Sequence, residues 1–122
     1  MTTRILVVED HPSMREALVA YVSSLPNVEV CGTAADAEDA LTELARASVD
    51  IVLIDISLPG MSGLDLLREV KARWHWIHCL ILTGHDAAAY RAEAFSRGAY
   101  GYVSKGNAED LGVAIRAARD GK

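Results

Sequence analysis

Five short apolar runs recur along the chain, and each is too brief to form a helix of ordinary length. They cover residues 5–8, 28–31, 51–54, 79–82 and 100–104. The first and third runs, Ile-Leu-Val-Val and Ile-Val-Leu-Ile, leave neither face polar. Such runs are typical of strands that are covered on both sides. The pattern therefore predicts five strands, several of them fully buried.

Between these runs and after the last one, the apolar residues change to helical spacing. The expected buried stripes are Met14, Ala17, Leu18, Tyr21 and Val22; Ala37, Ala40, Leu41 and Leu44; Leu64, Leu67, Val70 and Trp74; and Leu111, Ala114, Ile115 and Ala118. Pro12 suits the first turn of the first helix. Asp36, Asp86 and Asn107 are expected to cap three others, and Gly98 to end the alanine-rich fourth. Five helices are predicted.

Strict alternation of strands and helices indicates the α/β class. Right-handed βαβ units give a doubly wound parallel sheet with helices on both faces, a three-layer sandwich. With 122 residues, the chain is expected to form a single domain over residues 1–122. In this architecture the functional crevice lies at the carboxyl ends of the strands.

Composition narrows the possible functions. The net charge of −5 argues against direct contact of this domain with nucleic acid, which usually needs a basic face. No apolar stretch is long enough to span a membrane, and the N-terminus does not resemble a signal peptide, so a cytoplasmic location is expected. The two cysteines, Cys31 and Cys79, lie in strand-like runs and are expected to be reduced.

The residues that follow the predicted strands form an unusual set. Glu9 and Asp10 follow the first strand, Asp55 the third, Thr83 the fourth and Lys105 the fifth. Three neighbouring carboxylates would repel one another without a cation, and their oxygen ligands suit Mg²⁺. An aspartate can act as a nucleophile toward a phosphoryl group, and Asp55 lies at the centre of the predicted crevice. Taken singly, each residue also has an ordinary explanation as a helix cap or a solvated loop residue.

The combination of Glu9, Asp10, Asp55, Thr83 and Lys105 resembles the receiver domains of two-component response regulators. Residues 54–63, Ile-Asp-Ile-Ser-Leu-Pro-Gly-Met-Ser-Gly, resemble the phosphoacceptor loop of that family. The resemblance implies a flavodoxin-like, CheY-like (βα)5 fold with strand order 2-1-3-4-5. It also implies that Asp55 accepts a phosphoryl group from a sensor histidine kinase or a phosphotransfer protein.

The resemblance further assigns roles within the site. Asp10, Asp55 and the backbone carbonyl of Ser57 are expected to ligate Mg²⁺ directly, and Glu9 through water. Thr83 and Lys105 are expected to contact the phosphoryl oxygens. The remaining expected roles belong to Tyr102, which changes rotamer during switching, and to Ser57 and His85, which tune hydrolysis of the phosphoryl group. The only catalysis expected of the domain is its own phosphorylation and dephosphorylation.

Two segments, residues 9–18 and 98–106, resemble the NarL/FixJ subfamily. That likeness implies transcription regulation through a helix-turn-helix domain after Lys122, and an output surface from the fourth to the fifth helix that can form a homodimer. Most receivers have proline after the lysine, whereas this chain has Gly106. A trans Lys105–Gly106 bond is therefore expected.

Three other functions would fit parts of this pattern. A receiver fold that signals through protein contacts without phosphorylation remains the main alternative. A dehalogenase-type hydrolase would need a second acid where Ser57 stands, and a nucleotide-binding module would need a glycine-rich phosphate loop. The Trp-His-Trp-Ile-His-Cys segment at 74–79 fits no zinc spacing and is expected to be structural. A Cys31–Cys79 disulfide is not expected, since their strands are not neighbours in the family's order.

Overall fold

The computed structural model describes residues 2–84 and 88–121. Within them, strands and helices alternate throughout: β1 (Thr3–Val8), α1 (Pro12–Ser23), β2 (Val28–Ala34), α2 (Ala37–Arg46), β3 (Ile51–Asp55), α3 (Gly63–Arg73), β4 (His78–Thr83), α4 (Ala88–Ser96), β5 (Gly101–Ser104) and α5 (Ala108–Arg119). The strands form one parallel sheet in the order β2-β1-β3-β4-β5. The predicted α/β class and strand order are confirmed.

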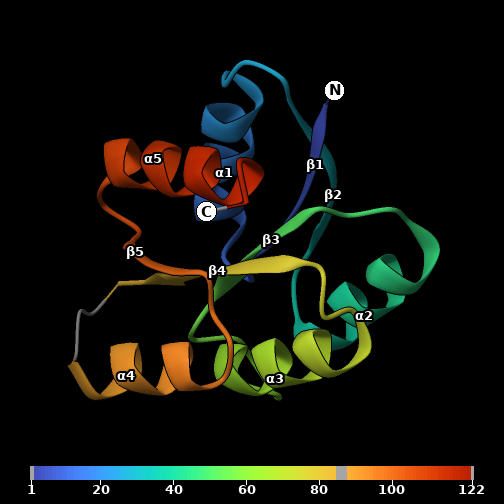
Figure 1. Ribbon diagram of the computed structural model, residues 1–122, viewed down its shortest axis with the longest axis vertical. Helices are drawn as coiled ribbons and strands as arrows, with labels where there is room; N and C mark the ends of the chain where they lie inside the picture. The colour runs from blue at the N-terminus through green and yellow to red at the C-terminus, as the bar shows by residue number, and fades with distance from the viewer. Residues whose placement is uncertain (1, 85–87, 122) are drawn as a thin grey trace.

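The sheet is covered on both faces. In Figure 1, α1 and α5 lie on one side of it, and α2, α3 and α4 lie on the other. Successive residues of a strand point to opposite sides, so each strand contributes side chains to two hydrophobic cores, one on each face of the sheet. On β3, Ile51 and Leu53 pack with α1 and α5, whereas Val52 and Ile54 pack with α2 and α3. All four are at most 1% exposed, which explains why the sequence shows a continuous apolar run there.

Local signals set most of the helix ends. Pro12 occupies the first turn of α1. The side chains of Asp36 and Asn107 accept hydrogen bonds from backbone amides three residues on, at 2.8 and 3.0 Å, as predicted for caps. Gly98 follows α4 with a φ of 102°, a conformation that favours glycine. The predicted cap Asp86 lies outside the described residues.

Two helix stripes differ from the prediction. Ala17 is exposed, because α1 presents Leu18 and Val22 to the sheet. In α3 Leu67 and Val70 are buried as predicted and Leu64 is partly buried against the same core, but Leu66, which was not predicted, is fully buried. Trp74 caps the end of α3 and is only partly buried. No helix in residues 2–84 and 88–121 combines the length and apolarity needed to cross a bilayer.

Candidate functional site

The parallel sheet brings the five predicted residues to one edge. Backbone hydrogen bonds continue past the strand ends and fix the loops that carry them. The Glu9 amide donates to the Ala34 carbonyl at 3.0 Å, and the Lys105 amide donates to the Thr83 carbonyl at 2.8 Å. Main-chain contacts of the sheet thus help to position the loops that carry the acids and the lysine.

Lys105 joins two of the buried carboxylates. Its Nζ lies 2.8 Å from Glu9 Oε1 and 3.0 Å from Asp55 Oδ2. Glu9 is 0% exposed and Asp55 is 2% exposed, so both charges depend on close partners rather than on water. The three side chains come from β1, β3 and β5, and the ion pairs confirm that these strand ends converge.

This environment shifts two pKa values. Burial raises the pKa of Glu9, with a smaller contribution from the nearby Asp55 charge, although Lys105 and the His11 amide act in the opposite direction. Burial by itself would lower the pKa of Lys105, but its hydrogen bonds to Glu9 and Asp55 outweigh burial and raise it. Lys105 is therefore held in its charged form beside the carboxylates.

Asp55 is anchored on both sides of its carboxylate. While Oδ2 faces Lys105, Oδ1 accepts a hydrogen bond from the Ser57 amide at 3.0 Å. The backbone directly after Asp55 is held by Gly63, whose amide donates a hydrogen bond to the Ile56 carbonyl at 3.1 Å. A Cβ built on Gly63 would lie only 2.2 Å from the Asp55 carbonyl oxygen. The sequence pattern of residues 54–63 gives no sign of this close approach at Gly63.

The acidic residues form a donor set suitable for a hard cation. Glu9, Asp10 and Asp55 each offer one carboxylate oxygen, and these oxygens all lie within 4.8 Å of one another. They border an open hollow of about 380 Å³ that Ser57 and Lys105 also line. Three carboxylates against one ammonium leave an excess of negative charge that a divalent ion would offset. This oxygen-rich set fits Mg²⁺.

The comparison with protein families agrees with this geometry. Residues 5–116 match the family model described as the response regulator receiver domain. The chain belongs to that family. Receiver domains of response regulators interact with histidine kinases or phosphotransfer proteins, and they generally bind Mg²⁺.

Several response regulators are similar to this receiver domain. Response regulator UvrY of Escherichia coli is 32% identical over 119 residues, covering 97% of this chain and 55% of that protein. The nitrate/nitrite response regulator NarP of E. coli is 34% identical, with the same two coverages. This chain thus spans about half the length of these relatives.

Solved structures extend the likeness to three dimensions. A LuxR-family two-component response regulator from Aurantimonas superposes with a TM-score of 0.95 at 35% identity, covering all of this chain and 88% of the other. The signal receiver domain of the putative response regulator NarL from Mycobacterium tuberculosis gives 0.92 at 29% identity, covering 99% of this chain and 98% of the other. The predicted NarL/FixJ resemblance is confirmed.

Tyr102, the residue expected to change rotamer during switching, lies on β5 near this edge of the receiver domain. Its side chain is buried, at 8% exposure. Its hydroxyl is buried, and no described residue hydrogen-bonds to it. The guanidinium of Arg91 on α4 lies 5.6 Å from the centre of its ring. His85 lies outside the described residues, and the Lys105–Gly106 bond is trans as predicted.

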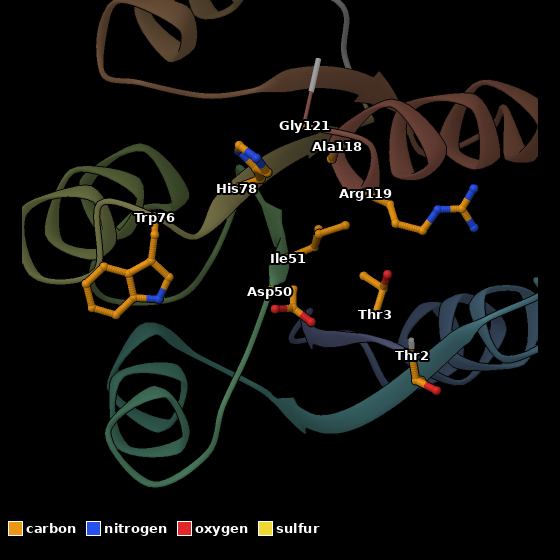
Figure 2. A pocket seen from close by; sticks show the side chains of 9 residues that line it. All are labelled: Thr2, Thr3, Asp50, Ile51, Trp76, His78, Ala118, Arg119 and Gly121. Carbon is orange, nitrogen blue, oxygen red and sulfur yellow. The ribbon is translucent and has the colours of Figure 1, made fainter.

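The opposite edge of the sheet contains the tryptophan- and histidine-rich segment. Figure 2 shows a pocket there, of about 470 Å³, between the starts of the central strands and the end of α5. The Trp76 ring and the Arg119 side chain extend to opposite sides of it rather than converging (Figure 2). This arrangement supports a structural role for the segment. Cys31 and Cys79 are both free, as expected.

Proposed function

We propose that Asp55 accepts a phosphoryl group from a sensor histidine kinase or a phosphotransfer protein in a Mg²⁺-dependent reaction. The observation that carries this proposal is the double anchoring of its carboxylate, by the Ser57 amide at 3.0 Å and by Lys105 at 3.0 Å. A nucleophile held in one orientation avoids much of the entropic cost of phosphoryl transfer. Asp55 also borders the open hollow and is therefore within reach of a phosphoryl donor.

The surrounding residues have distinct parts in this reaction. Asp10, Asp55 and the Ser57 carbonyl would hold Mg²⁺ directly, and Glu9 would assist through water. The bound ion would neutralise negative charge on the phosphoryl oxygens. Lys105 supplies a second positive charge beside Asp55, and the buried Thr83 at the end of β4 supplies a hydroxyl. The domain's catalysis is confined to its own phosphorylation and dephosphorylation.

Phosphorylation would then switch an output surface. Thr83 moves toward the phosphoryl group, and Tyr102, whose buried hydroxyl has no described partner, changes its packing in response. The adjoining helices expose three large apolar side chains, Tyr90 (52%), Phe95 (43%) and Val113 (54%). This α4–β5–α5 surface is the proposed homodimer interface. Ser57 and His85 would set how fast water removes the phosphoryl group.

The relatives suggest what the switch controls. Another relative, DevR/DosR of Mycobacterium tuberculosis, is a DNA-binding transcriptional activator that is 31% identical over 102 residues, which cover 47% of its length. We therefore propose that the domain acts in the cytoplasm, without contacting nucleic acid itself, and regulates transcription through a helix-turn-helix domain attached to it. The acidic net charge of −5 supports this division of roles.

Intact-mass measurement tests the phosphoryl transfer. The protein is incubated with acetyl phosphate and Mg²⁺, beside the Asp55→Ala variant and a chelator control. The matched control is Asp120→Asn, which removes an exposed carboxylate after α5. One added phosphoryl group in the wild type and in D120N, but not in D55A or with chelator, is expected.

The main alternative is a receiver that signals without phosphorylation. An unchanged wild-type mass, together with failure of beryllofluoride to bind, would favour that alternative. A phosphoryl group on D55A would instead show that a different residue is the acceptor.

A further inference from the structure

Arg15 occupies a position that helix electrostatics alone would disfavour. It is the fourth residue of α1, near the positive end of the helix dipole, where cations are destabilising. The first turn of α1 contains no acidic residue, and the N-cap residue His11 makes no side-chain capping bond. Some other interaction must therefore account for a half-buried guanidinium here.

The hydrogen bonds of Arg15 show that interaction. Its Nη1 donates to the Glu9 carbonyl at 2.9 Å and lies 3.4 Å from the Asp10 carbonyl. These two carbonyls belong to the loop that carries two of the three clustered acids. The guanidinium thus contacts the backbone of the acidic loop while leaving its carboxylates available.

The consequences differ for the two acids. Glu9 is also fixed by its amide bond to Ala34 and by the His11 amide, which donates to Glu9 Oε2 at 3.1 Å. Asp10 is exposed, and among the described residues its carboxylate makes no ion pair. The direction of the Asp10 carboxylate therefore depends mainly on its backbone, which Arg15 holds.

We propose that Arg15 is a positioning residue for the divalent cation. Through these carbonyl contacts it fixes the loop so that the oxygens of Asp10 and Glu9 face Asp55. This inference rests on the proposed Mg²⁺-dependent function. Residues that orient metal ligands typically change metal affinity about 10- to 100-fold when they are removed, and Arg15→Ala is expected to weaken cation binding within that range.

Direct cation binding tests this role without any phosphorylation step. Free Mn²⁺ is measured by electron paramagnetic resonance during titration of wild type, R15A and R15K, with Mg²⁺ as competitor. R15K retains a charge and a donor, and it should recover part of the affinity. Arg4→Ala is the matched control, because Arg4 also donates from its side chain to a backbone carbonyl, that of Ser48 at 2.6 Å, at the other end of β1.

Amide hydrogen exchange in metal-free protein provides the second measurement. R15A should exchange faster at the His11 amide, while the strands keep their protection and R4A leaves that amide unchanged. Equal Mn²⁺ affinity in R15A and wild type would overturn the inference and leave the proposed function intact. Absence of Mn²⁺ and Mg²⁺ binding by wild type would overturn both. Equal losses in R4A and R15A would indicate general destabilisation and refute a specific role.

Discussion

Replacement of Gly63 by alanine tests how closely the start of α3 packs against the backbone of Asp55 and Ile56, at the proposed phosphorylation site. A Cβ at this position would lie 2.2 Å from the Asp55 carbonyl oxygen and 2.7 Å from the Ile56 Cα. Both are main-chain atoms, so no side-chain rotation can relieve the overlap. Either the first turn of α3 or the end of β3 must move, and a move of β3 shifts Asp55 itself.

Two opposing contributions decide the sign of the stability change. Gly63 is the first residue of α3, and alanine is favoured over glycine in a helix interior by up to about 1 kcal/mol. Forcing additional atoms into a packed site costs typically about 1–3 kcal/mol, and contact with backbone should place the cost at the upper end. We therefore expect G63A to lower the free energy of unfolding by about 1–2 kcal/mol.

Urea denaturation followed by far-UV circular dichroism measures this change, and intact mass over time measures phosphorylation by acetyl phosphate. Displacement of Asp55 should slow phosphorylation roughly 10- to 100-fold. Gly106→Ala is the control, because its Cβ would meet only the Ser104 hydroxyl, at 3.9 Å; G106A should be neutral or slightly stabilising. A G63A protein as stable as wild type, or more stable, would refute the argument from close packing.

Two further predictions concern groups away from the phosphorylation site. Burial, and then repulsion from Lys71, lowers the pKa of His78 below its ordinary 6.5, so the unfolded chain binds more protons between the lowered value and 6.5. Wild type should therefore lose stability as pH falls below 6.5, and His78→Gln should lose less in urea titrations at pH 5.5 and 7.5; equal losses would contradict this. Burial raises the pKa of Cys79 to about 12, so a thiol reagent should modify only Cys31 in the native protein and both cysteines in urea. Rapid native modification of two thiols would disagree with the structure.

The fold was predictable because the sheet is buried on both faces. A strand covered on each side must be apolar at every position, and the run at 51–54 shows this directly. The helices have only one buried face, which is harder to choose. In α3 the full burial of Leu66 and the partial burial of Leu64 depend on how the helix is rotated against the sheet. That rotation is set by tertiary packing and not by spacing along the chain.

The site was predictable only in part, for a similar reason. Parallel strands end at a common edge, so Glu9, Asp55 and Lys105 were expected to meet, and the ion pairs of Lys105 confirm it. The contact between Arg15 and the Glu9 carbonyl was not predicted. Every residue has a carbonyl, so a side chain that binds one requires no particular partner in the sequence. The close approach of Gly63 to Asp55 was missed because it too involves backbone alone.

The three clustered carboxylates are not equivalent, and their differences favour Asp55 as the nucleophile. Asp10 is exposed, and no ion pair among the described residues aligns its carboxylate for attack. Glu9 is fully buried, with Oε1 paired with Lys105 and Oε2 accepting a hydrogen bond from the His11 amide within its own loop. Asp55 is oriented by an amide on one oxygen and by Lys105 on the other. Because a nucleophile must be aligned with the group it attacks, this two-sided orientation favours Asp55 as the nucleophile, and its neighbours are better suited to holding the cation.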